Sequence, residues 1–142
     1  MSYRLYIAIY RSLISNPNDE FLRAYVFKNN GKEVYQMYFL LKSSEWSRPS
    51  QINFTAGLGS KPTDRIGIDA KCSGASCSNL EDVIVNFTGT ELEQAIANLE
   101  ARSELLLSFR IKGQSGKDYD GSISINEIRA ILQAVDTYKA EN

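Results

Sequence analysis

Apolar and polar residues alternate with a period of two over much of the chain, and this pattern predicts β-strands. The Asn30-Gly31 pair lies between two segments rich in aromatic and branched residues, and it tolerates the positive φ angles of a tight hairpin turn. We therefore expect an antiparallel hairpin around this pair. The segments predicted as strands are 3–14, 22–27, 34–41, 52–55, 65–71, 83–87 and 105–111. The segments predicted as turns or loops are 15–19, 43–51, 58–64 and 72–79.

Two segments late in the chain carry apolar residues at helical spacing instead. Each begins with a Ser or Thr followed three positions later by Glu, the capping-box pattern that starts a helix. The first pair is Thr88 with Glu91, and it predicts a helix over about 89–101. The second pair is Ser124 with Glu127, and it predicts a C-terminal helix. The apolar residues at helical spacing are Leu92, Ile96 and Leu99 in the first helix and Ile128, Ile131, Leu132 and Val135 in the second.

The order of these elements predicts the fold class. Strands come first and at hairpin spacing, which favours an α+β domain with a mainly antiparallel sheet of six or seven strands and two helices in the C-terminal third. A chain of 142 residues with 43% hydrophobic and 23% charged residues is typical of one globular domain, so we expect residues 1–142 to form a single domain.

The charge balance limits the classes of partner. Sixteen basic and seventeen acidic residues give a net charge of −1, without the positive field that attracts nucleic acid. No segment reaches the roughly 18 consecutive apolar residues of a membrane span. We therefore expect no nucleic-acid partner and no membrane insertion. The compartment stays open between the cytoplasm and export with a signal that this sequence does not contain.

The chain contains no histidine, the commonest general base at neutral pH and the commonest metal ligand. It also lacks a phosphate-binding glycine loop, a nucleophile elbow and a dinucleotide fingerprint. These observations favour a non-enzymatic binding or interaction domain, which uses a sheet face or exposed loops. The partner, a protein or a small ligand, and the oligomeric state stay open.

Residues 116–127 resemble the Ca²⁺ loop of an EF-hand, in which oxygen ligands alternate around a central glycine. Gly121 occupies the glycine position of that pattern, but Gly116 stands at the first ligand position and has no side-chain oxygen. A Ca²⁺-binding or Ca²⁺-stabilised module is therefore one hypothesis. Its candidate metal ligands are Asp118, Asp120, Ser122 through its carbonyl, Ser124 and Glu127.

The same segment has a simpler interpretation. Asp-Tyr-Asp-Gly favours a turn, and Ser124 with Glu127 then caps the next helix. Capping occupies the Glu127 carboxylate, which therefore competes with its use as a metal ligand. We favour the helix-starting turn and keep Ca²⁺ as the alternative.

Cys72 and Cys77 are the only cysteines, and four residues separate them in a segment of small residues. The spacing allows a small disulfide in an oxidising compartment, or two reduced thiols in a surface loop.

Trp46 with the nearby Arg48 suggests a surface for a small ligand or a carbohydrate, because aromatic faces bind the apolar faces of sugars. This is the third functional hypothesis.

Overall fold

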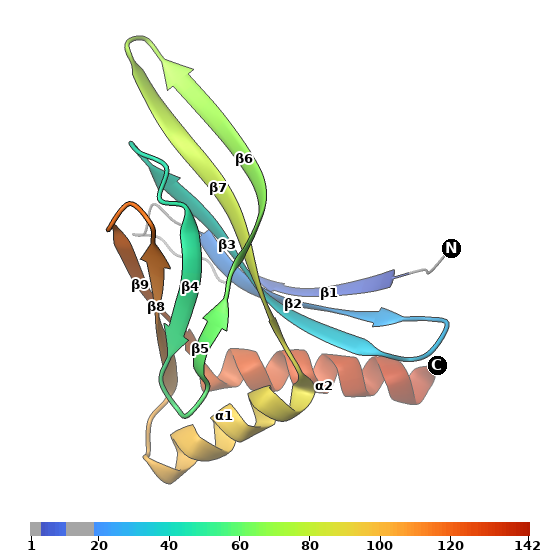
Figure 1. Ribbon diagram of the computed structural model, residues 1–142. Coiled ribbons are helices and arrows are strands. Elements are labelled where there is room, and N and C mark those ends of the chain that lie inside the picture. The colour runs from blue at the N-terminus through green and yellow to red at the C-terminus, as the bar shows by residue number, and fades with distance from the viewer. Residues whose placement is uncertain (1–3, 11–18) are drawn as a thin grey trace.

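The computed structural model describes residues 4–10 and 19–142, and within them nine strands form two antiparallel sheets (Figure 1). The first sheet has five strands in the order β1-β2-β3-β7-β6. Its strands are β1 (Arg4–Tyr10), β2 (Asp19–Phe27), β3 (Glu33–Ser43), β6 (Asp64–Ser73) and β7 (Ser76–Phe87).

The second sheet has four strands in the order β5-β4-β8-β9. Its strands are β4 (Pro49–Phe54), β5 (Gly59–Pro62), β8 (Leu106–Gly113) and β9 (Asp118–Ser124). The two helices are α1 (Gly89–Ala101) and α2 (Ile125–Glu141). Neither helix is both long and apolar enough to cross a membrane.

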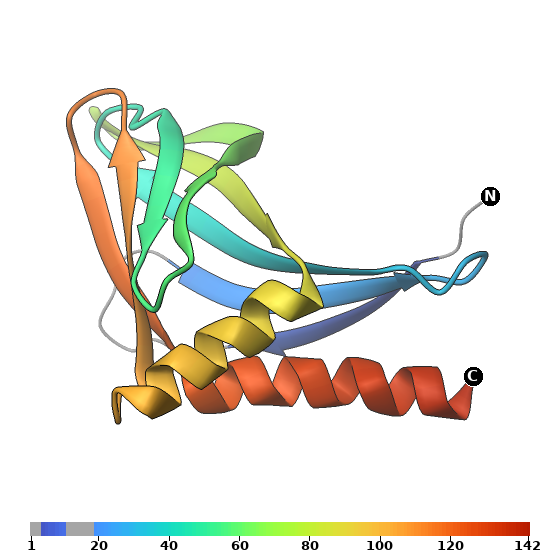
Figure 2. The ribbon, with the colours of Figure 1, turned by 60° about the horizontal axis from the view of Figure 1, so that its bottom comes forward.

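The core lies between the two sheets and beneath the helices. Phe39 of the first sheet contacts Phe109 of the second with ring centroids 5.1 Å apart, and Phe87 contacts Phe54 at 5.3 Å. Helix α2 packs on β1 and β2, and α1 packs on α2, so the helices cover the β1–β2 end of the first sheet (Figure 2). Burial of these apolar faces is the main stabilising contribution to such a fold.

Several sequence predictions are confirmed. Strands β2 and β3 pair as a hairpin, and Gly31 in the turn has a φ of 69°. Both capping boxes are present, with Thr88 and Glu91 at the start of α1 and Ser124 and Glu127 at the start of α2. The α+β class is also confirmed.

The predicted number of six or seven strands is wrong, because the residues of β5 and β9 have the composition of turns. Strand β5 is a short edge strand containing glycine and proline, and most of its residues are exposed, so it lacks an apolar face. In β9 only Tyr119 and Ile123 are apolar, and polar residues and a glycine occupy the positions between them. Pairing with β8, a tertiary interaction, holds this polar segment in a strand.

The predicted loop at 72–79 is also wrong. Strands β6 and β7 continue through this segment and leave a two-residue turn, Gly74-Ala75, in which Gly74 has a φ of 63°. The predicted loop at 43–51 shortens to residues 44–48. The predicted strand residues 11–14 and most of the predicted turn at 15–19 lie outside the described residues.

Candidate functional site

The β6–β7 hairpin projects from the body of the molecule as an arm, which we define as residues 64–79 (Figure 1). Strand β6 is the last strand of its sheet, and no described strand pairs with its outer edge. Every residue of β6 except Gly67 is exposed. Within the described residues, the arm therefore has a free strand edge along β6.

Two large hydrophobic side chains lie on this exposed strand. Ile66 is 52% exposed and Ile68 is 61% exposed. Only two other large hydrophobic residues in the described part of the chain are exposed, Leu105 and Leu106, which lie after α1 at the start of β8. Proteins usually protect a free strand edge with charge, proline or a bulge, and β6 carries four charged residues and a register shift. The two isoleucines are nevertheless exposed beside these charges, and exposed apolar side chains can mark a contact surface.

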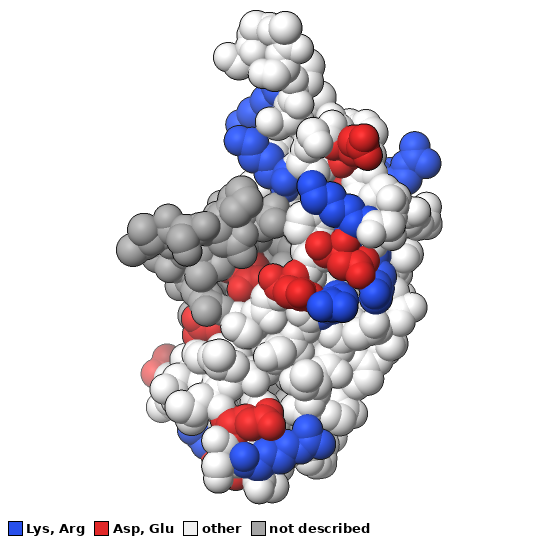
Figure 3. Space-filling view, turned by 90° about the vertical axis from the view of Figure 1, so that its left-hand side faces the viewer, with Lys and Arg blue, Asp and Glu red and all other residues white. Residues whose placement is uncertain are grey.

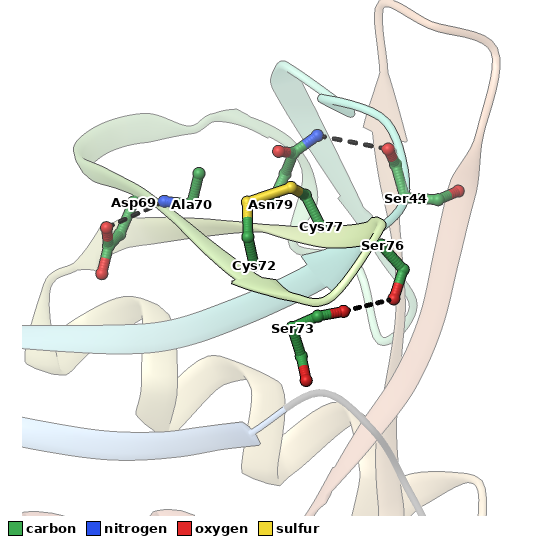
Figure 4. Close-up of a disulfide and its surroundings, with 8 residues drawn as sticks. All are labelled: Ser44, Asp69, Ala70, Cys72, Ser73, Ser76, Cys77 and Asn79. Atoms are coloured by element: carbon green, nitrogen blue, oxygen red, sulfur yellow. Dashed lines mark hydrogen bonds between the residues drawn. A yellow bond between two sulfur atoms is a disulfide. The ribbon is translucent and has the colours of Figure 1, made fainter.

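The tip of the arm is closed by a disulfide between Cys72 and Cys77, which lie opposite each other in the β6–β7 register (Figure 4). The Ser76 hydroxyl donates a hydrogen bond of 3.2 Å to the Ser73 carbonyl across the turn. The Asn79 amide donates to the Ser44 carbonyl at 3.3 Å. The arm is thus covalently closed near its tip and attached to the loop 44–48.

The base of the arm is held by a buried carboxylate. Glu81 on β7 is fully buried, and it accepts hydrogen bonds from the Ser47 backbone N–H at 3.0 Å and the Ser47 hydroxyl at 2.6 Å. The Arg48 backbone N–H donates at 2.9 Å, and the Arg65 guanidinium of β6 donates at 3.2 Å. These hydrogen bonds replace the water that the carboxylate loses on burial, so the buried charge is tolerated.

The pKa of Glu81 reflects two opposing causes. Burial raises the pKa of this carboxyl, but the hydrogen bonds from Ser47, Arg48 and Arg65 outweigh burial and lower the pKa below its ordinary value. Glu81 is therefore ionised at neutral pH. It connects the loop 44–48, β7 and β6 through these hydrogen bonds.

Strand β6 has a register shift between Arg65 and Gly67, the irregularity of a β-bulge. A Cβ at Gly67 would lie 2.7 Å from the Asp82 carboxylate, so glycine provides the space for that side chain. Asp82 accepts a hydrogen bond from the Tyr38 hydroxyl. Burial, reinforced by this bond, raises the pKa of Tyr38 to about 12, so the hydroxyl stays protonated.

Trp46 and Arg48 lie together in the loop 44–48. With Gln114 and Ser115 they line a shallow pocket of about 350 Å³. Trp46 is half-buried and Arg48 is exposed. The Gln114 N–H donates to the Arg48 carbonyl at 3.1 Å, which joins the two loops that form the pocket.

The acidic residues of 116–127 are placed differently from the ligands of a metal loop. The Asp120 carboxylate forms two hydrogen bonds with Arg110, at 2.6 and 3.0 Å, and Asp118 forms one with Lys112 at 2.8 Å. Hydrogen bonding to Arg110 lowers the pKa of Asp120. Both aspartates belong to β9 and face basic residues of β8.

Glu127 takes part in a helix cap and Ser122 in strand pairing. Glu127 accepts a hydrogen bond from the Ser124 N–H at 3.2 Å, as a helix cap does, and Ser122 pairs with Ser108 in the strand register. Within residues 20–142, no group of three or more His, Cys, Asp or Glu side chains could hold a metal ion. The Ca²⁺ hypothesis stays a prediction, and the structure does not bring its candidate ligands together.

Figure 3 views the molecule from the left-hand side of Figure 1. Basic and acidic side chains alternate on this face, and no extended area carries one sign of charge outside the grey atoms. The tip of the arm carries no charged residue between Ser73 and Asn79. The charged side chains on the face shown in Figure 3 therefore form no extended patch of one sign.

Sequence reasoning missed Glu81, Arg65 and the edge isoleucines. One signal was present: Glu81 shares the alternating register of Val83, Val85 and Phe87, all buried, so it is a charged residue at a core position of its strand. No pattern in the sequence distinguishes Ile68 from a buried strand residue, because its exposure depends on the place of β6 at the end of the sheet.

Comparison with known proteins gives no relative for this chain: no protein-family model matches it, and no curated protein or solved structure is significantly similar to it.

Proposed function

We propose that this chain is a non-catalytic protein-interaction domain and that the free edge of β6 is its binding surface. The observation that carries the proposal is the exposure of Ile66 and Ile68 on a strand whose outer edge pairs with no described strand. Removing such side chains from water on binding is favourable, by roughly 25 cal/mol for each Å² of apolar surface.

The mode of binding that this geometry supports is the addition of a strand from the partner. Main-chain hydrogen bonds along the edge supply affinity, and alternate side chains supply specificity. The Ala70 N–H donates to the Asp69 carboxylate at 2.8 Å, so this amide of β6 is not used in pairing with β7. The disulfide and the Glu81 contacts hold the edge in place before binding, which reduces the ordering cost of association.

A site-specific photo-crosslinker tests the proposal. The crosslinking residue replaces Ile68, and a matched control replaces Leu105, which is 71% exposed but lies far from the arm in sequence. Irradiation takes place in cells that express the chain, and mass spectrometry identifies the crosslinked peptides. We expect protein crosslinks from position 68 in excess of those from position 105. Equal crosslinking at both positions, or none at 68, contradicts the proposal.

A second candidate function has a specific observation in its favour. Trp46 and Arg48 line a shallow pocket of about 350 Å³, which is a suitable size for one sugar ring or a similar small ligand. Trp46 is the only tryptophan in the chain, so its fluorescence reports this pocket directly. Titration with a panel of mono- and oligosaccharides should shift the emission in the unmodified protein and less in Arg48→Ala. An unchanged spectrum across the panel removes this candidate.

A further inference from the structure

We propose that the partner of β6 is a second copy of this chain, with the two β6 strands paired antiparallel about Ala70. This inference rests on the proposed function, since it names the partner of the same edge. Three features of the edge support it: the backbone groups that face outward, the length of regular strand and the charges along it.

The register with β7 determines which backbone groups face the free edge. Ser73 and Ser76 close the two-residue turn, so the pairs along the arm alternate between hydrogen-bonded and non-hydrogen-bonded ones from there. Cys72, Ala70 and Ile68 fall at non-hydrogen-bonded positions, where N–H and C=O point away from β7. The contact between the Ala70 N–H and the Asp69 side chain agrees with this assignment.

The regular part of the edge is centred on Ala70. The bulge between Arg65 and Gly67 interrupts it on one side, and the turn at Gly74 ends it on the other. Residues 67–73 remain between these limits. Ala70 is the middle residue of this stretch, so a two-fold axis at Ala70 uses the whole regular edge of both copies.

The charges select the same register. With the axis at Ala70, Asp69 lies opposite Lys71 of the second copy, and the symmetry makes this pair twice. Moving the axis by one residue places Asp69 opposite Asp69 of the second copy, or Lys71 opposite Lys71, and like charges directly opposite are unfavourable. Within the regular stretch 67–73, only the register about Ala70 pairs outward-facing amides and also pairs opposite charges.

The side chains of the other face are compatible with this register. Ile68 lies opposite Cys72 of the second copy, so the exposed isoleucine would contact the disulfide of the facing arm. On pairing, the Ala70 N–H releases the Asp69 carboxylate and donates instead to the Ala70 carbonyl of the second copy. The Asp69 carboxylate can then pair with Lys71 of the second copy. The short stretch of paired strand makes a small interface, so the dimer is weak and depends on concentration.

Sedimentation velocity with the purified full chain, from about 1 µM to about 1 mM, tests the pairing. We expect a monomer–dimer equilibrium in the unmodified protein. Asp69→Lys and Lys71→Asp each place two pairs of like charges in the interface, so each should weaken dimerisation about tenfold or more. The double variant exchanges the two charges and should restore dimerisation to within about threefold of the original. Circular dichroism verifies that each variant is folded.

Three results overturn the inference: a monomer throughout the concentration range, a dimer whose affinity is unchanged by either single variant, or a double variant no better than the single ones. Reduction of the disulfide should also weaken the dimer, since it releases the end of the edge. Crosslinks from position 68 to a different protein, together with a monomeric chain, overturn self-pairing and leave the proposed function standing. An absence of crosslinks from position 68 contradicts both self-pairing and the proposed interaction function.

Discussion

The hydroxyl of Ser47 donates a hydrogen bond of 2.6 Å to the carboxylate of Glu81, which is fully buried at the base of the arm. The same carboxylate also accepts hydrogen bonds from the backbone N–H groups of Ser47 and Arg48 and from the Arg65 guanidinium. One side chain thus joins a loop and two strands. Ser47, which is distant in sequence from the arm, thus helps to hold the strand that carries the proposed binding edge.

Glu81→Gln should lower the free energy of unfolding by about 2–3 kcal/mol, because hydrogen bonds to a buried charged group are lost and one amide donor then faces other donors. Glu45→Gln is the matched control, since Glu45 is exposed within the same loop, and it should change stability by less than about 0.5 kcal/mol. Urea unfolding monitored by circular dichroism measures both values. Equal, small effects in the two variants would show that the Glu81 contacts contribute little.

Acid should remove the stability that Glu81 contributes. Its pKa in the folded chain lies below the ordinary value of about 4.5, so the folded state favours the ionised form. The contribution is present above that ordinary value and is lost as the pH falls through the folded pKa. The difference in unfolding free energy between the unmodified protein and Glu81→Gln should therefore be largest near about pH 7 and shrink toward about pH 3. A difference that stays constant or grows on acidification contradicts this account.

Gly121→Ala tests why a glycine stands in the middle of β9. A Cβ at this position would overlap the Phe109 ring, which lies over the glycine from the neighbouring strand. We expect a loss of about 1–3 kcal/mol from overpacking. Gly89→Ala is the control, because the nearest atom to a Cβ there is 3.4 Å away at the first residue of α1, and it should be neutral or slightly stabilising. Thermal unfolding of the two variants distinguishes packing from a general effect of glycine replacement.

Calcium should not shift the melting temperature if Glu127 serves only as a helix cap. Under the metal hypothesis, about 1 mM Ca²⁺ raises the melting temperature when the ion binds the native state well below that concentration. Glu127→Gln separates the two roles, since Gln also forms a capping box but is a poor substitute for a bidentate carboxylate. We expect melts of the original and the variant to be the same with Ca²⁺ and with chelator. A Ca²⁺-dependent increase lost in Glu127→Gln would establish the metal site.

Local sequence patterns are sufficient where the interactions that form an element are themselves local. The Asn30-Gly31 turn and the capping boxes at Thr88 and Ser124 involve residues at most a few positions apart, so the chain alone specifies them. The alternation of Val83, Val85 and Phe87 likewise identifies a strand with one buried face. The absence of histidine by itself excludes every catalytic site that needs an imidazole base.

Tertiary structure decides what depends on distant neighbours. Asp118 and Asp120 on their own indicate a turn or a metal loop, but β8 supplies Lys112 and Arg110 as cross-strand partners, which hold the segment in a strand. The exposure of Ile68 and the burial of Glu81 oppose their hydropathies: the loop 44–48 contacts Glu81, while Ile68 lies opposite it on the terminal strand of the sheet. Periodicity in a sequence specifies which residues share a face of a strand, but the packing of the whole chain determines which faces are covered.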